Sequence, residues 1–312
     1  AEILWPRRCS LTCSYCHMAT GQGNTPTLAY WKLGLDNLKK LGCSFIAIYG
    51  AEPLLDFDKL PEFISYAYDV GFDMTVITSG IVPALKSKLY ELYQAGLRSL
   101  TVSYDILPLD VSGQLKTNAA IKALETFRNI GPVDNVGVIV TVTRENFTLL
   151  PDVIREMSAR GIWVFFDLVH WDRGQIGCKC GIVGCRFLFR ETDIPYLRTI
   201  FYEINKLKQG GMLVHNSQTF LNLPISYNWN CAIDDCFPSW VTVNCDGLVY
   251  PCDDFQPCRL GIPAVELYNQ WEEIKALWRP VTLSCPGCFW STHIDAHNVK
   301  KGIEQIRGYI HK

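Results

Sequence analysis

The sequence lacks any uninterrupted apolar run near the roughly 18 residues that a membrane-spanning helix needs. It also lacks an excess of charge, because 29 basic residues stand against 31 acidic ones, and no basic stripe marks a track for nucleic acid. The opening residues, AEILW, do not resemble a signal peptide. We therefore expect a soluble, cytoplasmic protein that has neither a membrane nor a nucleic acid as its partner.

Cysteine, in contrast, is plentiful, with 14 in the chain. A disulfide framework is typical of small secreted domains, whereas 312 residues, 48% of them hydrophobic, can bury a large core. In a reducing compartment such thiols are metal ligands, catalytic groups or small core residues. Their distribution along the chain decides between these roles, and it is strongly clustered.

Six segments share one order: a helix-like stretch, a glycine, and a short apolar run. The glycines are Gly42, Gly71, Gly96, Gly131, Gly161 and Gly210. Glycine adopts the left-handed conformation at a helix C-terminus most easily, so each one marks a helix end before a strand. With an opening strand at about residues 2–5, this alternation predicts about six βα units before residue 210. The parallel sheet is either open and doubly wound or an incomplete barrel, and in both the chemistry lies at the carboxyl ends of the strands.

The pattern changes near residue 230, where short β-like runs and many turns begin. Seven cysteines follow: Cys231, Cys236, Cys245, Cys252, Cys258, Cys285 and Cys288. This density of thiols predicts a small appendage held together by metal. We place the barrel at residues 1–210, a linker at 211–230, and the appendage with a C-terminal helix at 231–312.

A first cysteine cluster, CSLTCSYC, directly follows the opening strand. Cys9, Cys13 and Cys16 have the spacing C-x3-C-x2-C, which can fold around one metal centre, and cubane iron–sulfur clusters use cysteine ligands. Structural zinc usually takes four ligands, and the nearest fourth candidate, His17, follows Cys16 too closely to complete the same site. Three protein ligands would leave one iron open.

This spacing, with Tyr15 before the last cysteine, strongly resembles the radical S-adenosylmethionine (SAM) superfamily. The resemblance implies an α/β fold, a partial (β/α)6 TIM-type barrel, over roughly residues 3–170. It also implies a [4Fe–4S] cluster whose open iron is chelated by the amino and carboxylate groups of SAM. Cleavage of SAM by one electron then gives a 5′-deoxyadenosyl radical, which abstracts hydrogen from a substrate C–H bond.

Polar segments after the next strands resemble positions of that family that contact SAM. Gly50-Ala51-Glu52-Pro53 is similar to the Gly-Gly-Glu-Pro segment that binds the SAM amino group, with alanine in place of the second glycine. Close approach of backbone to a ligand favours such small residues. Thr78-Ser79-Gly80 resembles a Thr-Asn-Gly turn of the family. Each segment alone is also typical of an ordinary turn.

Two further strand ends complete this series. In Ser103-Tyr104-Asp105, the resemblance implies a serine that contacts the SAM ribose or carboxylate and an aspartate that faces the substrate. Polar residues that would line the same cavity follow the fifth strand: Thr141, Thr143 and Asn146. The order of these segments at successive strand ends supports the resemblance more than any one of them does.

A second signature lies in CFPSWVTVNCDGLVYPCDDF. Cys236, Gly247 and Cys252 match the C-x(9–15)-G-x4-C pattern of the SPASM and twitch subfamilies, and Asp246-Gly247 is a strong hairpin-turn signal between two short strands. The resemblance implies a twitch-like domain with one auxiliary [4Fe–4S] cluster. Its ligands would be Cys236, Cys252, Cys285 and Cys288, or Cys231 in place of one of the last two. A zinc ribbon is the alternative.

Two groups of candidate catalytic residues remain. In sulfatase-maturating relatives, an aspartate in the position of Asp253 resembles a general base, and a carboxylate beside a thiolate-ligated cluster would have the raised pKa that a base needs. A solvated carboxylate or hairpin cap fits Asp253 equally well. GCKCGIVGC places Cys178, Cys180 and Cys185 after the sixth strand. They would bind zinc or another cluster, donate a hydrogen atom to a substrate radical, or remain reduced thiols in a loop.

The sequence therefore predicts a radical SAM enzyme of the oxidoreductase or epimerase type. We expect no peptide-recognition domain before the barrel, and this expectation favours a small polar substrate such as a sugar, an aminocyclitol or a natural-product intermediate. The expected electron donor is a flavodoxin- or ferredoxin-type protein. Two alternatives stay open: radical modification of a peptide or protein side chain, and a non-catalytic iron–sulfur or zinc protein.

Overall fold

The computed structural model describes residues 1–5, 8–16, 26–106, 111–169, 186–226, 240–252, 261–283, 291 and 294–295. Its first half alternates strands with helices: β1 (Glu2–Leu4), α1 (Leu28–Lys40), β2 (Phe45–Tyr49), α2 (Leu60–Asp69), β3 (Asp73–Thr78), α3 (Leu85–Gln94), β4 (Ser99–Ser103), α4 (Val111–Arg128), β5 (Asn135–Val142), α5 (Leu150–Ala159) and β6 (Trp163–Leu168). There follow α6 (Ile194–Gln209), α7 (Gln218–Ser226), β7 (Thr242–Val243), β8 (Leu248–Tyr250), β9 (Ile262–Pro263) and α8 (Trp271–Leu283). Three short 3-10 helices are η1 (Pro53–Leu55), η2 (Phe147–Leu149) and η3 (Glu191–Asp193).

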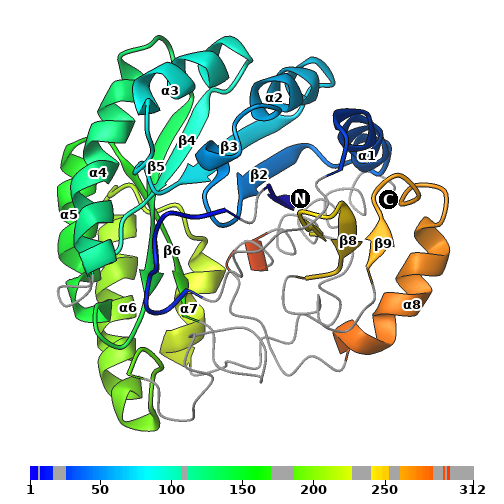
Figure 1. The fold of residues 1–312 in the computed structure, drawn as a ribbon. Helices are drawn as coiled ribbons and strands as arrows, with labels where there is room; N and C mark the ends of the chain where they lie inside the picture. The colour runs from blue at the N-terminus through cyan, green and yellow to red at the C-terminus, as the bar shows by residue number, and fades with distance from the viewer. Residues whose placement is uncertain are drawn as a thin grey trace, which may run out of the picture.

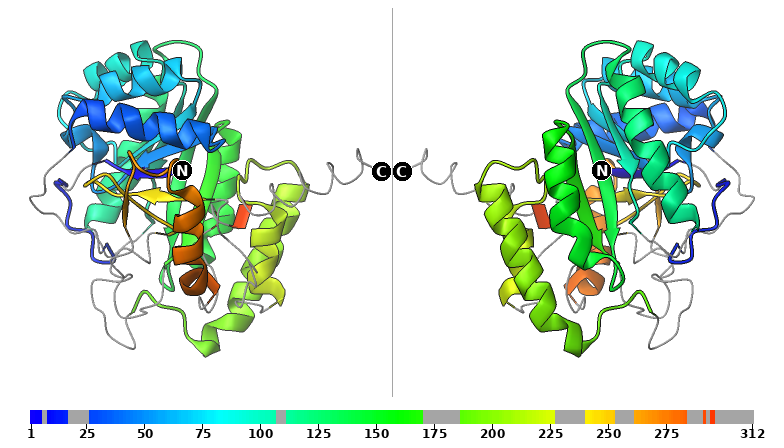
Figure 2. Two further views of the ribbon diagram at one scale, coloured as in Figure 1. Left: turned by 90° about the vertical axis from the view of Figure 1, so that its right-hand side faces the viewer. Right: turned by 90° about the vertical axis from the view of Figure 1, so that its left-hand side faces the viewer.

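All strands belong to one curved sheet in the order β6-β5-β4-β3-β2-β1-β7-β8-β9. Neighbouring strands pair in parallel from β6 through β1 to β7. β8 then pairs antiparallel with β7, and β9 pairs antiparallel with β8. Helices α1–α5 lie along the outer face of this sheet, and both side views keep them on that face (Figures 1 and 2). The α/β fold with a mostly parallel sheet and a partial barrel is therefore confirmed.

The two faces of the sheet differ in chemistry because side chains alternate along each strand. Residues that face the helices are apolar and fully buried, as Ile48 of β2, Val102 of β4 and Val140 of β5 are. They pack against helix residues such as Phe63 and Phe127 in one core.

The helix-ending glycines agree with the expectation in most units. Four of them have positive φ: Gly42 (88°), Gly71 (88°), Gly96 (106°) and Gly161 (67°). At the last unit α6 continues to Gln209, Gly210 keeps a φ of −76°, and Gly211 takes the left-handed conformation. The apolar run after Gly210 forms only an isolated bridge from Val214 to Val164, so the strand expected there is wrong and β6 is the last barrel strand.

The expected C-terminal hairpin is present and belongs to the barrel sheet. Thr242 pairs with Tyr250 and Val243 with Val249 in antiparallel register, and Gly247 in the turn has a φ of 79°. Because β7 also pairs in parallel with β1, the hairpin extends the sheet of the barrel. The segment 211–230, expected as a linker, contains α7, whose Phe220 and Leu221 are buried in the core. The domain boundaries themselves stay a prediction.

Hydrogen bonds to α1 hold this hairpin region in place. The Asn37 amide donates to the backbone carbonyls of Ala264, at 3.1 Å, and Val265, at 2.7 Å. Gly34 faces Ala264 so closely that an added Cβ would lie 3.1 Å from the alanine methyl group.

No helix in the described part of the chain is both long and apolar enough to span a bilayer.

Candidate cluster and cofactor site

Three cysteine side chains, those of Cys9, Cys13 and Cys16, lie on the loop that follows β1, at the carboxyl ends of the barrel strands. Cys13 is buried, with 6% of its surface exposed, and Cys9 and Cys16 are partly exposed. The loop turns tightly, since the Cys16 amide donates to the Cys13 carbonyl at 3.2 Å. The Leu11 amide donates to the Cys9 sulfur at 3.4 Å. The structure thus places the predicted cysteine loop at the rim where the sequence put it.

The chemistry of these donors fits an iron–sulfur cluster. Tetrahedral zinc, with Zn–S distances of about 2.3 Å, draws its sulfur ligands to within about 4 Å of one another. Within the described ranges, no three His, Cys, Asp or Glu side chains converge closely enough for a single ion. Burial raises the pKa of the Cys9 thiol, and the charge of Glu52 raises it further, while the Leu11 amide opposes this rise. A bound metal centre supplies the positive charge that such a thiol needs to ionise.

Beside this loop, the Glu52 carboxylate joins the ends of β2 and β3. It is 1% exposed and accepts hydrogen bonds from the Thr78 hydroxyl at 2.6 Å and from the Ser79 backbone amide at 2.8 Å. The Ser79 hydroxyl and the Leu54 amide also donate to it. The side chains of Glu52, Thr78 and Ser79 are therefore bonded to one another within the rim. A ligand at this rim would therefore meet the backbone of the segment from Gly50 to Pro53. Gly50 begins this segment with a φ of 138°.

At the end of β4, Asp105 takes part in a buried polar group that sequence reasoning missed in part. Its carboxylate is 1% exposed and accepts from Lys116 of α4, at 2.5 Å, and from the Tyr15 hydroxyl. Lys116 also donates to the Tyr15 oxygen at 2.8 Å. The Thr117 hydroxyl bonds the Asp105 carbonyl at 3.0 Å, so two consecutive residues of α4 hold this strand end.

These contacts shift the pKa values of Tyr15 and Lys116. Burial, followed by the neighbouring Asp105 charge, raises the pKa of Tyr15 well above its usual value, so the phenol stays protonated. Burial by itself lowers the pKa of Lys116, but Asp105 and Tyr15 outweigh this effect and the net pKa lies well above the usual range. Lys116 therefore stays charged. A signal for it was in the sequence, because Lys116 is in helical register with the buried Ala120, Ala123 and Phe127.

An apolar contact holds the cysteine loop from its other side. The Tyr15 ring meets Phe187 edge-on at 6.2 Å between centroids, and Cys13 belongs to the same small buried cluster. Phe187 in turn accepts a backbone hydrogen bond from Arg144, just after β5. Phe187, which the sequence analysis did not single out, lies two positions after Cys185. Cys178, Cys180 and Cys185 themselves lie outside the described residues.

At the end of β5, Asn146 closes its own turn. Its side-chain oxygen accepts from the Thr143 amide at 2.7 Å, and its side-chain nitrogen donates to the Thr141 carbonyl at 2.9 Å. Asn146 is 1% exposed, and these bonds occupy its carboxamide within the turn. The Thr141 side chain lies on the inner face of the sheet, where Thr141 pairs with Asp167 of β6. Of Thr141 and Asn146, it is thus Thr141 whose side chain lies on the barrel interior.

The inner face of the sheet is lined by polar side chains from all six barrel strands. Across it, the Tyr49 hydroxyl donates to Glu2 at 3.1 Å, and the Thr75 and Thr101 hydroxyls bond at 3.1 Å. Residues on this face include Glu2, Tyr49, Thr75, Thr101, Ser103, Thr141 and Asp167, and the apolar Ala47, Ile77, Ile139 and Phe165 lie among them. Barrel interiors are more often filled with Val, Ile and Leu, so the polar side chains of this face are the candidates for contact with a polar ligand.

The hairpin places Cys252 at the opposite end of the barrel from the cysteine loop. β7 runs parallel to β1, so β8 runs against it, and Tyr250 pairs with Thr242, which pairs with Glu2 at the start of β1. Cys252 follows and is buried. Cys245 lies in the hairpin turn, away from Cys252. The other proposed residues of this region lie outside the described residues: Cys231, Cys236, Asp253, Cys285 and Cys288.

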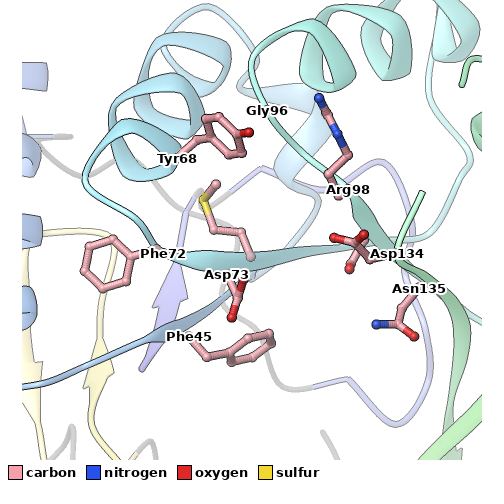
Figure 3. A pocket seen from close by; sticks show the side chains of 10 residues that line it. Phe45, Tyr68, Phe72, Asp73, Gly96, Arg98, Asp134 and Asn135 are labelled. Atoms are coloured by element: carbon pink, nitrogen blue, oxygen red, sulfur yellow. The ribbon is translucent and has the colours of Figure 1, made fainter. Parts of the chain in front are cut away.

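A separate cavity of about 350 Å³ opens at the amino ends of β2–β5, away from the cysteine loop (Figure 3). Phe45, Phe72 and Tyr68 form its aromatic sides, and the exposed Asp73 and Asp134 also line it. Catalytic sites of barrels of this kind lie at the carboxyl ends of the strands. We therefore place the candidate site at the cysteine loop and the inner wall.

Comparison with solved structures supports the fold. Streptococcus suis SuiB bound to S-adenosylmethionine has a TM-score of 0.64 at 16% identity, covering 86% of this chain and 65% of SuiB. Native anSMEcpe with bound AdoMet and the Cp18Cys peptide has a TM-score of 0.62 at 17% identity, covering 88% of this chain and 79% of that protein. Both likenesses continue beyond the first half of the chain.

Comparison of sequences gives the family. A curated relative, the S-adenosylmethionine-dependent nucleotide dehydratase of Selenomonas ruminantium, is 31% identical over 140 residues, which are 44% of this chain and 48% of the relative. The match thus spans about half the length of that relative. The profile of the radical SAM superfamily matches residues 3–157. Through this part, the chain belongs to the radical SAM superfamily.

Proposed function

We propose that this chain is a radical SAM enzyme that abstracts hydrogen from a small polar substrate held against the inner wall of the barrel. The observation that carries the proposal is the polar inner wall leading to the cysteine loop. Radical chemistry needs the substrate beside the cluster and shielded from water, and a partial barrel offers that enclosure.

Cys9, Cys13 and Cys16 would hold a [4Fe–4S] cluster with one iron left for SAM. When bound, the cluster and SAM supply a 5′-deoxyadenosyl radical. The chain's own part is to bind and orient: backbone at Gly50-Ala51-Glu52-Pro53 would meet the SAM amino group, and Tyr15, Thr78, Ser79, Ser103 and Thr141 would form the rest of the pocket. Asn146 would hold the turn beside Thr141. The hydrogen bonds of Glu52 to Thr78 and Ser79 support a positioning role for these three side chains.

The inner wall favours the small polar substrate over a peptide. Seven hydroxyl and carboxylate side chains lie on one face of the sheet, among apolar neighbours, which suits a small ligand that presents hydroxyl or phosphate groups. The nucleotide named for the Selenomonas relative is a substrate of this class. Modification of a peptide side chain is the second candidate, since the SuiB and anSMEcpe structures include complexes with a precursor peptide and with the Cp18Cys peptide.

An auxiliary [4Fe–4S] cluster would lie at the far end of this wall. Cys252 would ligate it with Cys236, Cys285 and Cys288, or with Cys231 in place of one of the last two. An electron acceptor at that end favours dehydrogenation, with Asp253 as the base that removes a proton. Epimerisation requires a hydrogen donor on the opposite face of the substrate, for which Cys178, Cys180 and Cys185 are the candidates. The electron for SAM cleavage would come from a flavodoxin- or ferredoxin-type protein in the cytoplasm.

The central test is anaerobic reconstitution followed by a SAM-cleavage assay. The Cys9→Ala, Cys13→Ala, Cys16→Ala triple variant should form no 5′-deoxyadenosine, whereas Cys43→Ala, which changes a partly exposed thiol before β2, should match the parent. Cleavage by the triple variant at the parent rate would overturn the assignment of the cluster. Acid-labile sulfide at zero in the parent would instead favour the non-catalytic zinc protein.

The substrate class is tested by the stimulation of SAM cleavage. Nucleotides, sugars and aminocyclitols should raise 5′-deoxyadenosine formation more than unstructured peptides of equal concentration do, and the reverse order would favour the peptide proposal. With an active substrate, reaction in heavy water separates the two outcomes. Deuterium at the reacting carbon indicates epimerisation, and its absence indicates oxidation.

A further inference from the structure

The buried group of Tyr15, Asp105 and Lys116 joins three elements that are far apart in the sequence. Tyr15 comes from the cysteine loop, Asp105 from the end of β4, and Lys116 from α4. The lysine nitrogen lies 2.5 Å from the carboxylate and 2.8 Å from the phenol oxygen. The phenol donates its own proton to the same carboxylate oxygen. Each member of the group therefore bonds both others.

Lys116 is 8% exposed and is the one buried lysine or arginine in the part of the chain that the structure describes. A buried ammonium group destabilises a fold unless it is paired and hydrogen-bonded, and here both conditions are met by Asp105 and Tyr15. The lysine also lies 5.3 Å from the centroid of the Tyr15 ring, within cation–π range. Its position is thus defined by the cysteine loop as much as by β4.

Tyr15 transmits this constraint to the thiols. It lies two positions after Cys13 and directly before Cys16, inside the turn that the Cys16 amide closes on the Cys13 carbonyl. Its contact with Phe187 is apolar and sets no unique rotation of the ring. Hydrogen bonds from the phenol are directional, so they fix the ring and with it the backbone between the two cysteines.

We propose that Lys116 is a positioning residue for the cluster loop: by bonding both Asp105 and Tyr15, it keeps Cys13 and Cys16 in the arrangement that takes up the cluster. This inference rests on the proposed function only for the statement that these cysteines are the ligands. It assigns Asp105 to the anchoring of the loop, in place of the substrate-facing role that the family resemblance implied.

The test is made first on the chain without iron or SAM. The alkylation rates of Cys9, Cys13 and Cys16 by iodoacetamide are measured by mass spectrometry in the parent and in Lys116→Met. We expect alkylation of Cys13 and Cys16 to be about tenfold faster in the variant, as the loss of charge-assisted hydrogen bonds allows the loop to open locally. The rates at Cys43 and Cys245, which lie outside the loop, should not change. An unchanged rate at Cys13 would overturn the proposal.

Further variants separate positioning from a general loss of folding. Tyr15→Phe leaves the Lys116–Asp105 pair intact and should still expose Cys13 and Cys16. The pair Lys116→Met with Asp105→Asn removes both buried charges and should return the rates toward those of Tyr15→Phe, below those of Lys116→Met alone. Faster alkylation at all five thiols in every variant would indicate unfolding and would contradict the proposal.

The loaded protein gives an independent readout. After anaerobic reconstitution, Lys116→Met should retain less iron per chain than the parent, and Lys116→Arg, which keeps the charge, should retain more than Lys116→Met. If the parent takes up no cluster but its thiols respond to Lys116→Met, the proposed function fails and the positioning role stands. If the parent cleaves SAM but Lys116→Met changes neither the thiol rates nor the iron content, the positioning role alone fails.

Discussion

The Tyr30 hydroxyl of α1 donates a hydrogen bond of 2.9 Å to the backbone carbonyl of Gly247, 217 positions further along the chain. The same hydroxyl accepts from the Ala264 amide at 3.2 Å. One phenol thus joins the first barrel helix to both the hairpin turn and the segment after β9. The C-terminal hairpin, and Cys252 at its end, is held in a defined position on the barrel through this contact and the pairing of β7 with β1.

Gly247→Ala should disrupt this contact. A Cβ at Gly247 would overlap the Tyr30 ring, and its φ of 79° disfavours any side chain. We expect the free energy of unfolding to fall by about 2–4 kcal/mol, from steric overlap and backbone strain together. Urea denaturation followed by circular dichroism measures it.

Gly42→Ala provides the matched control. Gly42 has a similar φ of 88°, but nothing lies within 4 Å of an added Cβ. The free energy of unfolding of Gly42→Ala should therefore fall only by the cost of backbone strain at this positive φ, about 1 kcal/mol. Equal losses in the two variants would show that Tyr30 does not pack against Gly247 as described.

Glu52→Gln should weaken the rim between β2 and β3. The carboxylate accepts hydrogen bonds from Thr78, Ser79 and Leu54, and an amide nitrogen in place of one oxygen cannot accept any of them. We expect a loss of about 2–3 kcal/mol in unfolding free energy, because buried donors lose charged partners. Thr78→Val, which removes one donor, should lose about half as much. An unchanged free energy of unfolding in Glu52→Gln would contradict this role.

Cys252→Ala should remove the auxiliary cluster and leave the other. If two [4Fe–4S] clusters are bound, reconstituted parent holds about eight iron per chain and the variant about four. Cys245→Ala, in the turn at the other end of β8 from Cys252, should keep about eight. A parent that holds about four iron, lost in the Cys9, Cys13, Cys16 triple variant, would leave the C-terminal thiols to zinc.

Asn216→Ala should loosen the edge of the sheet at β6. The Asn216 side chain accepts from the Phe166 amide at 3.0 Å and donates to the Phe166 carbonyl at 2.7 Å, so it occupies the place of a neighbouring strand. We expect a loss of about 2 kcal/mol in unfolding free energy and faster hydrogen exchange at the Phe166 amide. Thr219→Ala, on the exposed face of α7, should change neither. Unchanged exchange at Phe166 would show that the carboxamide is not its acceptor.

Local sequence was enough for the elements and for the cysteine loop. Apolar spacing and glycines located the barrel strands, and the Asp246-Gly247 turn located the hairpin, because these signals depend on neighbours within a few positions. The same reasoning failed after Gly210. The run there has the composition of a strand, but β6 offers it only the short bridge at Val214, and Asn216 occupies the next pair of backbone groups.

The candidate site could be predicted only in part from the sequence. The order of polar segments at successive strand ends was visible because parallel strands bring their carboxyl ends to one rim. The partners of those side chains were not visible, since Glu52 bonds Thr78 across two strands and Asp105 bonds Lys116 from a helix. The position of Lys116 in the apolar stripe of α4 indicated that this lysine is buried. Its role could not be predicted until its partner, Asp105, was known.

The sequence by itself determined the alternation of strands and helices, the C-x3-C-x2-C loop after the first strand and the hairpin turn, because periodicity, turn chemistry and ligand spacing are local properties of the chain. Only the tertiary structure decided that the hairpin continues the barrel sheet through β1, that polar side chains of six strands share the inner face, and that Tyr15, Asp105 and Lys116 form one buried group. Contacts between residues tens or hundreds of positions apart follow from how helices and sheet pack to bury their apolar faces, and a sequence pattern does not specify which polar groups that packing brings together.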